Sequence, residues 1–197
     1  MSINRREFLN STLVVSAAMA LPGSVYGQQT RVHTIAGTGI AGYEYEGVAG
    51  LPGTSTPVNN PYGVVVGPDG NLYFCEVDTG RIRRLDLQSG QLLTIAGNGE
   101  KAYAGDGRNA LEASFSAPHE IRFDSHGNLF VVERDAHVIR HIDGSTGTVS
   151  TLAGSGEPGF AGDGGPAVFG QFRQPHSIAF DSSGNLLVCD IGNHRVR

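Results

Sequence analysis

Two Pro-His steps are the residues of this sequence best suited to chemistry. Pro118-His119 and Pro175-His176 lie 57 residues apart, and the same interval upstream holds Pro61-Tyr62. Neutral imidazole is a frequent ligand of zinc and similar divalent metals. His119 and His176 are therefore candidate ligands of a zinc-like metal ion. The alternative is that both are polar residues hydrogen-bonded at the start of a strand.

Two Gly-Asp-Gly loops form the second candidate site. Asp106 and Asp163 each lie between glycines, where a carboxylate could present oxygens to Ca²⁺. Each loop has only one acidic residue, which favours a turn in which the aspartate caps its own backbone.

A repeated acid–base pair forms the third candidate, and it indicates structure. An acidic residue is followed seven residues later by arginine in each copy, which predicts an ion pair between neighbouring strands. No catalytic role is assigned to these pairs, which are Glu76 with Arg83, Glu133 with Arg140, and Asp190 with Arg197.

These residues share one period, so the chain is built from repeats. Proline, the Gly-Asn pair, the acidic residue and the hydrophobic-Arg pair all recur at 57 residues. The landmarks are Pro61, Pro118 and Pro175; Gly70-Asn71, Gly127-Asn128 and Gly184-Asn185; and Ile82-Arg83, Ile139-Arg140 and Val196-Arg197.

Each copy predicts four short strands. The first alternates apolar and polar residues, and the second is continuously apolar, which indicates burial on both faces. Glycine is abundant (29 residues) and charged residues are few (17%), which also favours strands and tight turns. The expected strands are 63–66, 72–75, 81–85 and 91–96; 120–124, 129–132, 138–142 and 148–153; and 177–181, 186–189 and a third beginning at Arg195. Val32–Ala36 matches a fourth strand without the three before it.

Four antiparallel strands per repeat is the plan of a β-propeller blade, so the fold class is all-β. His119 and His176 then start innermost strands, with their side chains toward the central channel. Glu120 would point to the opposite face.

The repeats resemble the NHL-repeat family of β-propellers. The matching text is TIAGNGEKAYAGDG…APHEIRFDSHGNLFVVERDAHVIRHID in the second copy and TLAGSGEPGFAGDGGPA…QPHSIAFDSSGNLLVCDIGNHRVR in the third. The first copy departs from it, because Tyr43–Gly50 lacks Gly-Asp-Gly and Gly67 replaces Asp124 and Asp181.

The Pro-His steps also resemble those of peptidyl-amidoglycolate lyase propellers, where such a step opens an inner strand and binds metal. This resemblance implies that His119 and His176 are ligands, with a third from a blade outside this sequence.

About three blades are predicted, whereas a closed propeller has four to eight, and six is expected here. One explanation is a truncated reading frame whose remaining blades are missing, and this is the one we favour. The other is a short chain whose second copy pairs head-to-tail into a six-bladed ring, completed by Val32–Ala36.

The two cysteines are expected to be free and buried. Cys75 and Cys189 occupy the same position two repeats apart, with a whole blade between them. A disulfide needs Cα atoms within about 7 Å.

The N-terminus predicts export. Residues 1–27 combine Arg5-Arg6, a short apolar run and a plausible cleavage site, the layout of a twin-arginine-like signal peptide, although ordinary secretory export is also possible. Residues 28–197 form the partial propeller, with repeats 34–93, 94–150 and 151–197. The expected location is periplasmic or extracellular.

Charge and hydropathy limit the classes of partner that the chain is expected to bind. A net charge of −5 gives no general attraction to nucleic acid, and no run is long enough to span a membrane. The favoured function is a binding or scaffold module that presents one propeller face to a protein, peptide or glycan. The alternative is a metal-dependent lyase or hydrolase that uses the channel histidines.

Overall fold

Each copy of the repeat folds into its own antiparallel sheet. The computed structural model describes residues 31–197, of which Thr34–Arg197 form one compact unit. The expected signal peptide, residues 1–27, lies outside the described residues. We call the three sheets blades 1, 2 and 3 in chain order.

Blade 1 is the sheet built from the first copy. It has the strand order β1-β5-β4-β3-β2, so consecutive strands are neighbours except at β1. The short β1 pairs with β5 through Leu51 and Leu92. The sequence does not indicate this pairing, because β1 has only two residues and one of them is proline. Its elements are β1 (Leu51–Pro52), η2 (Gly53–Ser55), β2 (Pro61–Val66), β3 (Leu72–Glu76), β4 (Arg81–Leu85) and β5 (Gln91–Ala96).

Blades 2 and 3 repeat the same meander. Blade 2 has the order β6-β7-β8-β9, and blade 3 has the order β10-β11-β12. Their elements are β6 (Pro118–Phe123), β7 (Leu129–Glu133), β8 (Val138–Ile142), β9 (Val149–Ala153), η3 (Ala167–Phe169), β10 (Pro175–Phe180), β11 (Leu186–Asp190), η4 (Ile191–Asn193) and β12 (Arg195–Val196).

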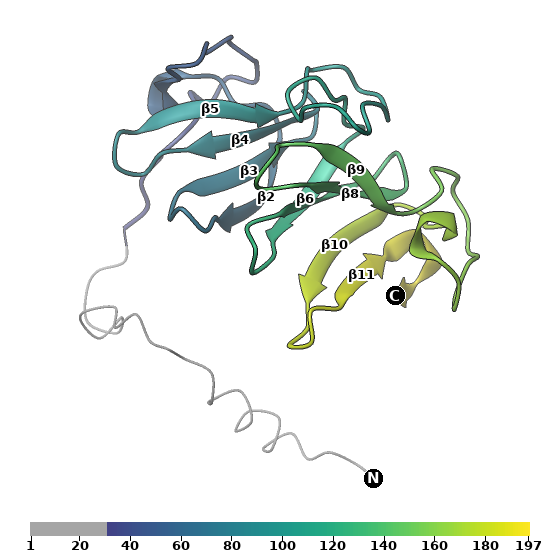
Figure 1. Cartoon of the computed structure of the whole chain (residues 1–197). Coiled ribbons are helices and arrows are strands. Elements are labelled where there is room, and N and C mark those ends of the chain that lie inside the picture. Colours follow the sequence, from purple (N-terminus) through teal and green to yellow (C-terminus); the bar gives the residue numbers. More distant parts are fainter. Residues whose placement is uncertain (1–30) are drawn as a thin grey trace. The chain divides into compact units, whose positions relative to one another are not determined.

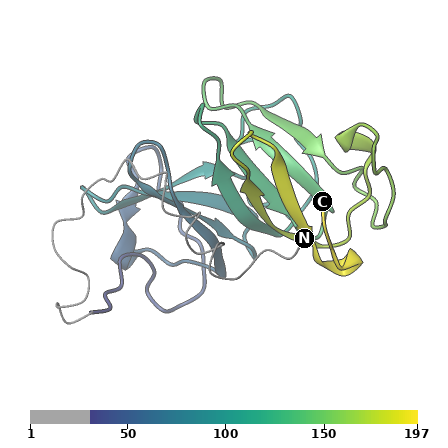
Figure 2. The ribbon, with the colours of Figure 1, turned by 90° about the horizontal axis from the view of Figure 1, so that it is seen from below.

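The sheets lie side by side in chain order (Figures 1 and 2). Alternate residues of β7 explain why: Val131 joins a core with residues of blade 1, whereas Phe130 and Val132 join a core with Ile178 and Val188 of blade 3. All five residues of β7 are buried, which confirms the expected burial on both faces. This is the arrangement of a partial β-propeller, as the sequence predicts.

The Gly-Asn turns have a common cap with one substitution. In blade 2, Asp124 Oδ1 accepts from the Asn128 backbone N–H at 2.9 Å, and its Oδ2 accepts from Asn128 Nδ2 at 2.8 Å. In blade 1, where Gly67 replaces that aspartate, Asp69 takes over both contacts to Asn71. The first copy therefore keeps the turn by moving its carboxylate two residues.

Two expectations need correction. Val32–Ala36 is not a strand, because no third strand lies beside it in the described part of the chain to supply a hydrogen-bonding ladder. Both cysteines are free, and Cys75 is buried as expected. Cys189 is only half-buried, because it lies on the face of blade 3 that packs against no other blade.

The repeats of the sequence are offset from the blades. The expected boundaries at residues 93/94 and 150/151 fall inside β5 and β9. Blades 2 and 3 therefore begin at the Pro step, blades 1 and 2 end after the fourth strand of the meander, and the long Gly-rich loop connects one blade to the next.

Candidate functional site

His119 and His176 are the extra residues of β-bulges. In blade 2, Pro118 pairs with Glu133 and Glu120 pairs with Val132, so His119 has no partner residue on β7. Pro175 and Ser177 flank His176 in the same way. A bulge turns the extra side chain away from its normal direction. His119 and His176 lie at the starts of their strands, as predicted, and the bulge changes the direction of their side chains.

Three rings from three blades line up at these strand starts. The ring centroids of Tyr62 and His119 are 4.2 Å apart, and those of His119 and His176 are 3.9 Å apart. We call these three residues the ring stack. The stack is open at one end, because Tyr62 is 43% exposed whereas His119 is 4% exposed. The two histidines, which were expected to face one channel, therefore lie together, and Tyr62 of the first copy joins them.

The stacked geometry differs from that of a metal-binding pair. Two imidazoles on one tetrahedral zinc ion, with Zn–N bonds of about 2.0–2.1 Å, would have ring centroids roughly 5 Å apart. The Glu120 carboxylate pairs with Arg122. Within residues 31–197 no three His, Cys, Asp or Glu side chains gather in a way that could hold a metal ion. The assignment of His119 and His176 as ligands remains a prediction that needs other rotamers and a further donor.

The stack favours neutral imidazole at its centre. Burial lowers the pKa of His119, and the electrostatic effects of His176 and Arg134 lower it further. A neutral ring can donate one hydrogen bond and accept another, and it stacks without a charge to desolvate.

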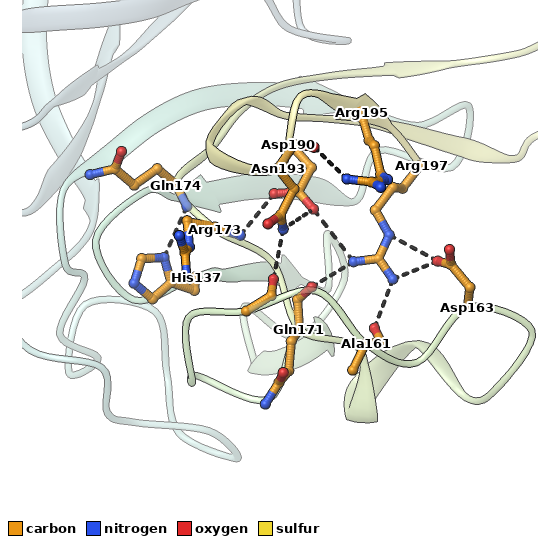
Figure 3. Close-up of polar contacts among 11 residues, drawn as sticks. His137, Ala161, Asp163, Gln171, Arg173, Gln174, Asp190, Asn193, Arg195 and Arg197 are labelled. Atoms are coloured by element: carbon orange, nitrogen blue, oxygen red, sulfur yellow. Dashed lines mark hydrogen bonds and ion pairs between the residues drawn. The ribbon is translucent and has the colours of Figure 1, made fainter.

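A buried carboxylate holds the chain just before each Pro step. In blade 2, Glu133 Oε2 accepts from the Ser116 backbone N–H at 2.6 Å, and Oε1 accepts from Arg140 Nη1 at 2.7 Å. In blade 3, Asp190 Oδ1 accepts from the Arg173 backbone N–H at 2.8 Å (Figure 3). The predicted ion pair is confirmed, and it also positions the strand that carries the histidine.

The Asp of each Gly-Asp-Gly loop binds the other side of the same arginine. Asp106 Oδ1 accepts from Arg140 Nε at 3.1 Å and from Nη2 at 2.6 Å, and Oδ2 accepts from Thr151 Oγ1 at 2.7 Å. Asp163 binds Arg197 in the same way (Figure 3). The expectation that this aspartate caps its own backbone was wrong, because the buried guanidinium has donors on both sides. We call Glu133, Arg140 and Asp106, and their equivalents, the arginine clasp.

The residue before each proline has a left-handed backbone, which the sequence did not reveal. Asn60, Ala117 and Gln174 have φ of 50°, 52° and 51°. In blade 2 this conformation lets the Ala117 carbonyl accept from the Arg134 backbone N–H at 3.1 Å. In blade 3 the Gln174 backbone N–H donates to His137 Nδ1 at 3.0 Å (Figure 3). Three unlike side chains share the position, so only its place in the repeat could have indicated it.

Comparison with known proteins finds similarity to NHL-repeat proteins. The family model of the NHL repeat matches residues 172–197. NHL repeat-containing protein 2 from Homo sapiens is 27% identical over 197 residues, which cover 85% of this chain and 26% of that protein. The chain therefore spans about a quarter of the length of this relative.

Two solved structures from Bacteroides share the fold. A structural genomics protein from Bacteroides thetaiotaomicron matches with a TM-score of 0.63 and 23% identity, over 69% of this chain and 34% of that one. An auxiliary nutrient binding protein from Bacteroides ovatus matches with a TM-score of 0.55 and 22% identity, over 72% of this chain and 37% of that one. Among residues 31–197, no helix has the length and apolar character required to cross a membrane.

Proposed function

We propose that this chain, which is similar to NHL-repeat proteins and whose blades form part of a β-propeller, is a binding module whose ligand contacts the ring stack. One observation carries the proposal: three blades each contribute one ring to a single row, and Tyr62 leaves the end of that row exposed. Aromatic faces with polar edges are common contact groups for ligands, because they bury a large area and still offer hydrogen bonds.

The proposed ligand is a protein, peptide or glycan. The Bacteroides ovatus structure is described as an auxiliary nutrient binding protein, which gives a precedent for ligand capture on this fold. The signal-like residues 1–27 support a periplasmic or extracellular site of action. Replacing Arg5 and Arg6 by lysine in a reporter fusion distinguishes twin-arginine export, which this change blocks, from ordinary secretion.

The test is binding of the purified chain to glycan and peptide arrays, followed by titration of each hit. We expect Tyr62→Ala and His176→Ala to weaken binding at least about tenfold. Matched controls are Tyr45→Ala, 80% exposed and outside the stack, and His126→Ala, whose side chain is 81% exposed in the β6–β7 turn. A hit that tolerates both stack variants, or an array without hits, contradicts the proposal.

The second candidate is a metal-dependent lyase or hydrolase, favoured by the lowered pKa of His119 next to His176. A bound divalent metal would polarise a carbonyl or activate water, with His119 and His176 as its ligands. Metal analysis of the purified chain decides: stoichiometric metal that is lost in both His119→Ala and His176→Ala supports this function. Metal content that is negligible, or equal in the variants, excludes a metal site that His119 and His176 complete within this chain.

A further inference from the structure

The arginine clasps of blades 2 and 3 share one detail. A single carboxylate oxygen lies between Nε and Nη2 of the arginine and accepts from both. In blade 3, Asp163 Oδ1 accepts from Arg197 Nε at 3.0 Å and from Nη2 at 2.7 Å, which matches the role of Asp106 Oδ1 at Arg140. One carboxylate oxygen thus binds the Nε/Nη2 edge of each guanidinium, and Nη2 also donates to a backbone carbonyl, that of Ala104 in blade 2 and that of Ala161 in blade 3.

Blade 1 lacks that contact. Its Gly-Asp-Gly loop is replaced, and Glu46 is the nearest acidic residue to Arg83 besides Glu76. The Glu46 Oε1 atom lies 3.7 Å from Arg83 Nη2, too far for a hydrogen bond, and it accepts instead from the Thr94 backbone N–H. Arg83 keeps its other contact, with Nη1 donating to Glu76 Oε1 at 2.9 Å.

Three neighbouring residues carry the polar atoms that are left: Arg83 pairs with Thr94 across β4 and β5, and Glu46 lies next to both. Within residues 31–197, Arg83 Nε, Arg83 Nη2, Glu46 Oε2 and Thr94 Oγ1 are buried and have no hydrogen-bond partner. Arg83 is 0% exposed and Glu46 is 6% exposed. In blade 2 the equivalent hydroxyl, that of Thr151, is bound by Asp106. Buried polar groups in folded proteins are nearly always hydrogen-bonded, so this cluster requires a partner.

The chemistry of the four atoms defines the partner. Two are N–H donors, one is a carboxylate acceptor, and one is a hydroxyl that can do either. The guanidinium disfavours a cation, and the carboxylates of Glu46 and Glu76 disfavour an anion. A water molecule offers two lone pairs and two O–H groups, which match two donors and two acceptors.

We propose that blade 1 contains a binding site for one internal water molecule, which takes the place that the Asp106 carboxylate has in blade 2. It accepts from Arg83 Nε and Nη2 and donates to Glu46 Oε2 and Thr94 Oγ1. The first copy therefore closes its clasp with solvent where the other copies use a carboxylate.

A crystal structure of the chain at about 1.5 Å or better tests the site directly. We expect one ordered water within about 2.7–3.2 Å of Arg83 Nε, Arg83 Nη2 and Glu46 Oε2. No water is expected between Asp106 and the matching edge of Arg140. A dry site, or Glu46 bound directly to both nitrogens of Arg83, overturns the proposal.

Oxygen-17 magnetic relaxation dispersion tests it in solution. Thr94→Val removes one of the four partners, so we expect the residence time of one long-lived water to shorten at least about tenfold. Thr151→Val, the matching change in blade 2, should leave every long-lived water unchanged because its hydroxyl binds Asp106 directly. An equal response in both variants, or none in Thr94→Val, contradicts the assignment.

Discussion

Two carboxylates bind the guanidinium of Arg140 from different sides, and only one of them is exposed to solvent. The Glu133 side chain is 0% exposed, whereas that of Asp106 is 46% exposed. Burial is the main reason why the pKa of Glu133 is raised to about 7; the charge of Asp106 adds to the rise, and Arg140 opposes it. The clasp of blade 2 therefore contains a carboxyl group that binds its proton more tightly in the folded chain.

This residue predicts a pH dependence of stability. A carboxyl with a raised folded pKa contributes stability that is fully present below its ordinary value of 4.5 and is lost as pH rises through about 7. Over that window Glu133 should lower the free energy of unfolding by on the order of 3 kcal/mol. Glu133→Gln should remove this part of the slope.

The measurement is urea unfolding of the wild type and Glu133→Gln at several pH values between about 4.5 and 7. Glu157→Gln, in the exposed loop before η3, is the control and should keep the wild-type slope. Parallel curves for wild type and Glu133→Gln would contradict the assignment.

Sequence reasoning at this scale found pairs whose members are close in the chain or equivalent in the repeat. Glu133 and Arg140 are seven residues apart and lie on neighbouring strands, and His119 and His176 are equivalent strand starts. The role of Asp106 was missed, because an aspartate between glycines has the same local pattern whether it caps a turn or reaches an arginine 34 residues away.

At the scale of elements, the loop after each fourth strand closes tightly on the turn between the second and third strands. Gly154 follows β9 with a φ of 97°, and an added Cβ would lie 2.4 Å from the His137 carbonyl oxygen. Gly97, after β5, approaches the Gly80 carbonyl oxygen in the same way. Glycine is required here for both its backbone conformation and its size.

We therefore expect Gly154→Ala to destabilise the chain by about 3 kcal/mol, from the positive φ and from the contact together. Gly164→Ala is the matched control: its φ is 78°, and nothing lies within 4 Å of an added Cβ. That change should cost only about 1–2 kcal/mol. Chemical denaturation gives both values, and equal losses would show that the close contact is not limiting.

The strands themselves were predicted to within one or two residues at most ends, because each landmark recurs three times. Two failures have a physical cause. Val32–Ala36 matches the text of a fourth strand, but a strand also needs a neighbour to pair with. β1 is too short to show any alternation, and its pairing with β5 depends on the fold of the loop before it.

At the scale of the whole molecule, the two end blades each have one face that packs against no other blade in the described part of the chain. On blade 1, Val64 and Val66 are 62% and 59% exposed. On blade 3, Leu187 is 43% exposed beside the half-buried Cys189. A cleft of about 930 Å³ also opens between blades 2 and 3, lined by Phe130, Phe172 and Phe180 among others.

These faces predict association. If further blades of a longer protein normally cover them, the purified chain should form heterogeneous oligomers through its exposed apolar surface. Val64→Lys and Leu187→Lys should shift the population toward monomer. Sedimentation velocity measures the distribution, and a single sharp dimer would support the alternative of two copies in a six-bladed ring.

The sequence predicted the radial stacking of blades because β7 is apolar on both faces, so it needs a neighbour on each side. It could not predict the ring stack in detail, because the bulges at His119 and His176 arise from strand pairing and leave no pattern of their own.

The arginine clasp has a consequence for how such chains can grow. All the side-chain partners of the blade 2 clasp fall between Asp106 and Thr151, a stretch shorter than one 57-residue repeat. A tandem gene duplication of one repeat would therefore copy the buried arginine together with both of its carboxylates. Unequal recombination could add or remove whole blades without an intermediate in which a buried charge has no partner.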